Sequence, residues 1–210
     1  MSSPNKTEQP LSDRKTAILD AAANLFAERG YAAVSIRDLA QATHITPAAL
    51  YHHFPDKDAI YDATLRHVFS DKASAIASVM KGADALEITL ERLIIWLTRE
   101  FSENPVMSRL VQRELLAGDR NRIRLLTEDV IAVPFREIQH LMQQLAPYQD
   151  ARLSAASIIS LVMGFIELSP ILEGLTGERN NKKRLSEFAA HAKHLVLYGL
   201  LTPPRSKEIL

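Results

Sequence analysis

Residues 35–54 of the chain read SIRDLAQATHITPAALYHHF. Ser35 can cap a helix, and Asp38 three residues later completes a capping box. Thr46 can cap a second helix with Pro47 at its first position, where a missing N–H group costs nothing. The three residues before Thr46 carry no helical period and fit a tight turn. The stretch therefore predicts a helix-turn-helix, a motif whose second helix can lie in the major groove of DNA.

Apolar residues continue the helical pattern on both sides of this motif. Upstream, a helix is expected from Ser12 or Asp13 to Arg29, ended by Gly30 as a C-cap. Its apolar stripe consists of Ile18, Leu19, Ala22, Leu25 and Phe26. Downstream, Asp56 can cap a long helix that is expected to reach about Met80.

The rest of the sequence predicts further helices and no strand. Expected helices span about 84–102, 105–117, 120–145, 151–172 and 185–201. Asn104–Pro105 and Asp150 supply helix starts. Pro134 should kink or split its helix, because proline removes a backbone hydrogen bond. The expected fold is all-α.

Composition sets weak bounds on function. The chain has 210 residues, no cysteine and a formal net charge of zero. Residues 1–58 carry six Lys or Arg and seven Asp or Glu side chains, which argues mildly against DNA binding, since DNA-binding proteins often have a basic surface. No signal peptide is expected. Residues 153–172 are the best membrane candidate, but Glu167, Pro170 and four serines favour a buried helix.

Residues 12–60 resemble the N-terminal DNA-binding domain of TetR-family transcriptional regulators. The matching segments are ILDAAANLFAERGYAAVSIRDLA and ITPAALYHHFPDKDAIY. They include Phe26, the Gly30–Tyr31 turn and a Leu-Tyr-x-His-Phe-x-x-Lys run that ends at Lys57. The resemblance implies a homodimer that pairs through its last two helices, a ligand cavity in the C-terminal part, a phosphate-binding role for Lys57 and an inward-facing His53.

The implied organisation has four parts. Residues 1–11 form a disordered tail, residues 12–58 a three-helix DNA-binding domain, residues 59–203 an effector-binding and dimerisation domain, and residues 204–210 a loose tail. The long helix after Asp56 would join the two domains.

The second helix of the motif offers no Arg, Lys, Asn or Gln for direct base readout. We therefore expect modest base contacts, with DNA shape contributing more of the specificity. Phosphate contacts suit hydroxyl groups and cations. The residues expected at DNA are Arg14, Ser35, Arg37, Thr46, Pro47, Ala48, Tyr51, His52 and Lys57.

Two further sets of residues follow from apolar composition together with the resemblance. An effector site is expected among His67, Trp96, Phe101, Met107, Arg113, Phe135, Met142, Met163 and Glu167, although for each residue taken singly core packing, with the charged groups on the surface, is the favoured explanation. A dimer interface is expected at Leu161, Phe165, Phe188, Leu195 and Tyr198, with a monomer core as the alternative.

The sequence thus predicts a cytoplasmic, nucleoid-associated regulator. It should be a repressor that binds a palindromic operator in double-stranded DNA as a homodimer and is released by a small apolar or amphipathic effector. No metal site is expected, because the spacing of the histidines suits no metal. No enzyme motif is found, and neither a cofactor nor a membrane partner is expected. Two alternatives stay open. One is a DNA-binding protein without an effector, which acts in chromosome organisation or through a protein partner. The other is a helical enzyme or ligand-storage protein that retains the DNA-binding domain only as an evolutionary relic.

Overall fold

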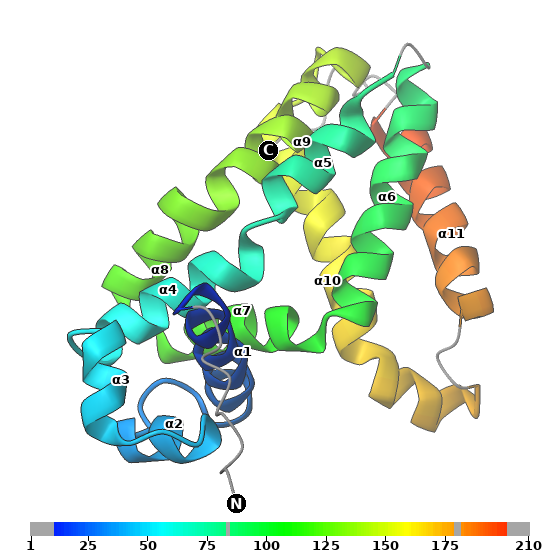
Figure 1. The fold of residues 1–210 in the computed structure, drawn as a ribbon. Helices are drawn as coiled ribbons and strands as arrows, with labels where there is room; N and C mark the ends of the chain where they lie inside the picture. Colours follow the sequence, from blue (N-terminus) through cyan, green and yellow to red (C-terminus); the bar gives the residue numbers. More distant parts are fainter. Residues whose placement is uncertain (1–10, 83–84, 179–181, 201–210) are drawn as a thin grey trace, which may run out of the picture. The chain divides into compact units, whose positions relative to one another are not determined.

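A computed structural model describes residues 11–82, 85–178 and 182–200, and the elements in these ranges are all helical (Figure 1). The chain divides into two compact units. The first comprises Met1–Ser70 and Val106–Val130, and the second Asp71–Pro105 and Ile131–Leu210. The all-α fold class is confirmed.

The first unit is built around α1 and the helix-turn-helix. Its helices are α1 (Leu11–Arg29), α2 (Ile36–Ala42), α3 (Pro47–His53), α4 (Lys57–Phe69), α7 (Pro105–Ala117, whose first residue belongs to the second unit) and α8 (Arg120–Leu125). Gly30 ends α1 in the left-handed region at φ +78°, which favours glycine. The largest buried side chains are Phe26, Leu39, Leu50, Ile60, Tyr61, Leu65 and Leu110.

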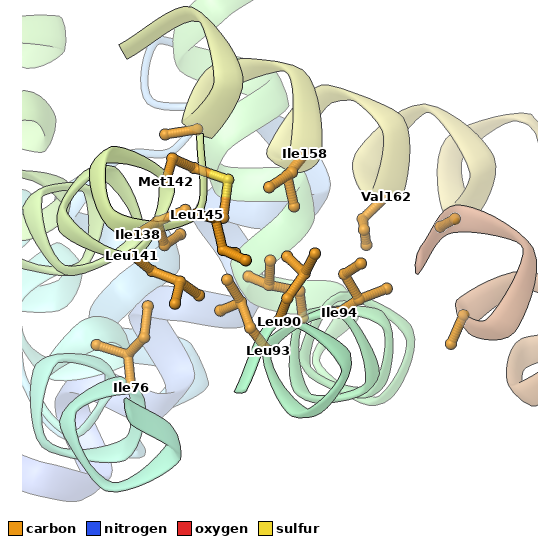
Figure 2. Packing of buried hydrophobic residues seen from close by; sticks show 14 of the residues in the cluster. Ile76, Leu90, Leu93, Ile94, Ile138, Leu141, Met142, Leu145, Ile158 and Val162 are labelled. Carbon is orange, nitrogen blue, oxygen red and sulfur yellow. The ribbon is translucent and has the colours of Figure 1, made fainter. Parts of the chain in front are cut away.

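The second unit is a bundle of α5 (Lys72–Met80), α6 (Leu86–Glu103), α9 (Ala132–Leu145), α10 (Ala151–Thr176) and α11 (Lys182–Leu200). The helix α6 lies against α10 and α11. Figure 2 shows its core, in which side chains from α5, α6, α9 and α10 point toward one another. Asp150 caps α10, as expected, by accepting hydrogen bonds from the backbone N–H groups of Arg152 and Leu153.

The single helix expected from Asp56 to Met80 is wrong, because the chain breaks into α4 and α5. The side chain of Ser70 donates to the carbonyl of His67, and that of Ser74 donates to the carbonyl of Asp71. Such local bonds compete with the helical pattern. The apolar period hides this break because Phe69 and Ile76 are seven residues apart and stay in phase.

The helix expected at 120–145 is divided, as Pro134 predicted. It consists of α8, a π-helical turn at Leu126–Ile131, and α9, which has Pro134 in its first turn. Pro134 has no backbone N–H to donate to the preceding turn, and the π-helical residues directly before α9 mark a local departure from the α-helical hydrogen-bond pattern.

The expected domain boundary after residue 58 differs from the observed grouping. Residues 59–70 and 106–130 lie in the same compact unit as the helix-turn-helix. Side chains on α7 reach α1 and α4, which are 53 to 86 residues away along the chain. The expected tails, residues 1–11 and 204–210, lie outside the described residues except for Leu11 at the start of α1.

In the described part of the chain, α10 is long and apolar enough to span a membrane by length and composition alone. Only 22% of its most apolar window is buried within the chain. A single helix of this kind is weak support for a membrane span, because a core helix of a soluble protein passes the same test of length and composition.

Candidate DNA interface

The helix α3 presents a continuous exposed face above a buried anchor. Leu50 and Phe54 fix the helix in the core of the first unit. Five residues predicted to contact DNA are all exposed on or just before this helix: Thr46, Pro47, Ala48, Tyr51 and His52. His53, which the resemblance implied to face inward, is only half-buried. The structure therefore brings the predicted readout residues onto one short helix.

Local capping sets the start of α3. The Oγ1 atom of Thr46 accepts a hydrogen bond from the backbone N–H of Ala49 at 3.1 Å, and Pro47 occupies the first helical position. The turn before it places His44 at φ +55°, a conformation that residues other than glycine rarely adopt. The turn and the cap together determine where the exposed face begins.

Ser35 and Arg37 lie at the start of α2. Ser35 and Asp38 form the predicted capping box, in which the backbone N–H of Ser35 donates to Asp38 at 2.7 Å. The hydrogen bonds from Ser35 and the nearby Arg29 guanidinium lower the pKa of the Asp38 carboxyl group. Arg37 and Arg14, the latter near the start of α1, are exposed, so both guanidinium groups are accessible to a phosphate.

Lys57 begins α4 and is half-buried. Its Nζ atom lies 4.0 Å from the centroid of the Tyr31 ring, and the hydroxyl of Tyr31 donates to Asp58. Burial lowers the pKa of the Lys57 ammonium, and the charge of Arg122 lowers it further, whereas Asp58 opposes the shift. The sequence predicted no role in DNA binding for Tyr31, Asp58 or Arg122. Its only indication of the contact between Tyr31 and Lys57 was the Gly30–Tyr31 turn, which belongs to the family resemblance.

Three of the predicted effector residues lie in the first unit. His67 bonds to Asp20 on α1 through its Nε2 atom at 2.7 Å, and Met107 is buried. Arg113 donates to the backbone carbonyls of Ala27 and Glu28 at the end of α1. His67 and Arg113 thus hold helices of the first unit together.

The other six effector candidates lie in the second unit. Trp96, Phe101 and Phe135 pack partly buried against its core, and Met142 is buried inside it. Met163 is half-buried and Glu167 is exposed. A hollow of about 490 Å³ opens between α6 and α11, and its lining contains none of these six. Its lining residues are Ile95, Thr98, Arg99, Glu103, Lys182, Leu185, Ser186 and Ala189.

The predicted dimer residues are split between core and surface. Phe165 and Phe188 stack with ring centroids 3.8 Å apart, and Leu161 packs partly buried against the same core. Leu195 and Tyr198 on α11 are exposed. Four further large apolar side chains are exposed on α10: Leu153, Leu168, Ile171 and Leu175.

Replacing Thr46 by alanine should lower the stability of the first unit by about 1 kcal/mol, because the helix loses its cap. Urea denaturation followed by circular dichroism measures the change. Thr46→Ser keeps the capping oxygen and should remain within a few tenths of a kcal/mol of the parent. Equal losses in both variants would show that the cap does not hold α3.

A capped, exposed second helix on a buried anchor defines a helix-turn-helix DNA-binding protein. A family model described as bacterial regulatory proteins, tetR family, matches residues 18–64. The HTH-type transcriptional repressor Rv3405c of Mycobacterium tuberculosis (strain ATCC 25618 / H37Rv) is 29% identical over 185 residues, which cover 81% of this chain and 87% of that protein.

The HTH-type transcriptional repressor KstR2 of Rhodococcus jostii (strain RHA1) is 40% identical over 83 residues. This match covers 40% of the chain and spans only 41% of the length of KstR2. Among solved structures, the TetR family regulator PfmR of Thermus thermophilus has a TM-score of 0.65 and 27% identity, covering 87% of this chain and 98% of that one. FadR of Bacillus halodurans has a TM-score of 0.70 and 19% identity, with coverage of 93% and 98%.

The chain belongs to the tetR family of bacterial regulatory proteins. It is a DNA-binding transcriptional repressor.

Proposed function

We propose that this repressor binds a palindromic operator as a homodimer and releases it when a small apolar or amphipathic molecule binds the second unit. The observation that carries the proposal is the exposed face of α3, anchored by Leu50 and Phe54. Lys57, Arg14 and Arg37 would contact DNA phosphates. Their placement compensates for the lack of net positive charge in residues 1–58. The protein acts in the cytoplasm, at the nucleoid.

Exposed apolar side chains on α10 and α11 support dimerisation. Leu168, Ile171 and Leu175 on α10 are all more than half exposed, as is Tyr198 on α11. Leu168, Ile171 and Leu175 recur at the spacing of one helix face, and exposed apolar side chains gathered in this way are typical of an interface. To place both copies of α3 on successive half-sites, such a dimer would have to space them by about 34–36 Å, one turn of DNA.

The effector would act by population shift. A molecule that binds only the conformation unable to span two half-sites pulls the dimer away from DNA. A complete switch requires a preference of about 5.5 kcal/mol for that conformation. Stearoyl-CoA is a suitable first probe, because FadR of Bacillus subtilis was solved in complex with it. Operator affinity that does not change when such a probe binds would exclude this coupling for that probe.

A second candidate function is organisation of the chromosome without an effector. The nucleoid occlusion factor SlmA of Marinomonas sp. (strain MWYL1) is 26% identical over 161 residues, covering 74% of this chain and 82% of SlmA. Binding sites scattered over the whole chromosome would favour this function, whereas one or a few promoter sites would favour the effector-released repressor.

Footprinting on the DNA that flanks the gene of this protein, at two salt concentrations, tests the main proposal. We expect a protected palindrome of about 15–25 base pairs, the length of two half-sites one turn apart. Protection should weaken with salt, since phosphate contacts release counterions. Absence of salt-dependent binding to any duplex would contradict the proposal and favour an enzyme or ligand-storage protein that retains the DNA-binding domain only as an evolutionary relic.

Replacing His52 by alanine should weaken operator binding about tenfold, because one hydrogen bond to a base or phosphate is lost in each protomer. Fluorescence anisotropy with operator variants measures the affinity and the sequence preference. His140→Ala on α9, another exposed histidine, is the matched control and should bind as the parent does. Unchanged affinity and preference in His52→Ala would remove His52 from the interface.

A further inference from the structure

A chain of contacts joins α7 and α8 to the lysine that begins α4, all within the first unit. The side chain of Glu114 on α7 is only 1% exposed. Its Oε1 atom accepts a hydrogen bond from the Tyr61 hydroxyl at 2.5 Å, and its Oε2 atom accepts one from Nε of Arg122 at 2.8 Å. A buried carboxylate needs such partners, because an unpaired charge in the core is strongly destabilising.

Arg122 on α8 is held by more than this carboxylate. Its Nη1 atom lies 3.3 Å from Asp119, the residue that caps α8. With Nε and Nη1 fixed, the Cζ atom of the guanidinium lies over the Tyr31 ring, 4.5 Å from its centroid. Arginine suits this position because its planar, weakly hydrated guanidinium can bond to carboxylates and stack on a ring at the same time.

Tyr31 is therefore contacted by two cations, Arg122 from α8 and Lys57 from α4. The bond from its hydroxyl to Asp58 restrains the position of the ring. Burial and the neighbouring Asp58 raise the pKa of Tyr31 to about 12, so the hydroxyl remains a donor at neutral pH. A free lysine side chain samples many rotamers, and the Tyr31 ring restricts that freedom at the first turn of α4.

We propose that Glu114 and Arg122 are positioning residues for DNA binding: they hold the Tyr31 ring against Lys57, so that the ammonium group is preorganised for a backbone phosphate. We name this set of four residues, Tyr31, Lys57, Glu114 and Arg122, the phosphate latch. The inference rests on the proposed contact between Lys57 and DNA. It extends that function because it makes affinity depend on α7 and α8, which contain none of the predicted DNA contacts.

The test is a double-mutant cycle on operator affinity and its salt dependence. Lys57→Ala should weaken binding about tenfold. The slope of log K against log salt concentration should become less negative by about 0.9 for each phosphate that Lys57 neutralises in the parent complex. Arg122→Gln should weaken binding about three- to tenfold in the parent, but less than about twofold in the Lys57→Ala background. An effect of the same size in both backgrounds would overturn the proposal, since Arg122 would then act independently of Lys57.

Arg124→Gln is the matched control, because Arg124 is exposed on the same helix and loses the same charge. It should retain nearly full affinity, and equal weakening in both arginine variants would reduce the effect to net charge. Arg122→Lys should not restore binding, because an ammonium group cannot both bond to Glu114 and stack on Tyr31. If Arg122→Gln fails to fold, the double variant Glu114→Gln/Arg122→Gln removes the buried charge as well, and the same loss of affinity is expected.

A measurement without DNA separates failure of the latch from failure of the proposed function. In the free protein, the ε-methylene protons of Lys57 should show an upfield NMR shift from the Tyr31 ring. The shift should persist in Arg124→Gln and collapse in Arg122→Gln. Parent protein that binds no DNA would refute the proposed function, whereas an unchanged lysine shift in Arg122→Gln would refute the latch by itself.

Discussion

Replacing Phe26 by alanine should lower the free energy of unfolding of the first unit by about 3–5 kcal/mol, the usual cost of removing a buried phenyl ring. Phe26 is fully buried. Its ring meets Tyr61 edge-on with centroids 4.8 Å apart and stacks on Tyr31 at 6.1 Å. The cavity would thus open beside both tyrosines, and DNA binding should be lost together with stability.

Urea denaturation followed by far-ultraviolet circular dichroism measures the loss in Phe26→Ala. The single tryptophan, Trp96, lies in the second unit, so its fluorescence shows whether that unit unfolds at the same urea concentration. Phe26→Leu keeps most of the apolar volume and should lose less than about 2 kcal/mol. A loss below about 1 kcal/mol in Phe26→Ala would mean that this ring is not part of a tightly packed core.

Replacing Leu195 by glutamate should convert the dimer to a monomer and weaken operator binding about 100-fold or more, because two linked half-site contacts become independent. Leu195 is 46% exposed on α11, so the folded protomer tolerates a charge there. In the proposed interface the same charge would be buried twice, once in each protomer, without a partner.

Sedimentation velocity and operator titration measure the two effects of Leu195→Glu. Val133→Glu is the matched control, because Val133 is 44% exposed on α9 of the same unit. It gains the same charge but should remain dimeric. A dimeric Leu195→Glu variant with full affinity would place the interface on another surface.

The parts of the fold that local chemistry controls were predictable from the sequence. Ser35, Thr46, Asp56 and Asp150 each cap the helix that their position in the sequence predicted. Pro134 lies where the expected helix divides. Each of these signals acts within four or five residues, so the printed sequence contains all that is needed to interpret it.

Contacts between distant segments could not be predicted in the same way. Arg113 and Glu114 follow each other on α7, yet one binds the end of α1 and the other binds Tyr61 on α4. A charged residue beside an apolar run fits a ligand site, a buried ion pair or the surface equally well. For this reason the sequence suggests an effector site for Arg113 and does not reveal the partners of Glu114.

The two stretches that build the first unit have a consequence for engineering. A chimeric regulator that grafts residues 1–70 of this chain onto a foreign effector half would leave Tyr61 without its carboxylate acceptor and the end of α1 without Arg113. A DNA-binding unit that is transferred to another protein must therefore include residues 106–130 as well. A chimera that keeps the first unit whole and exchanges the second needs three junctions, after residues 70, 105 and 130.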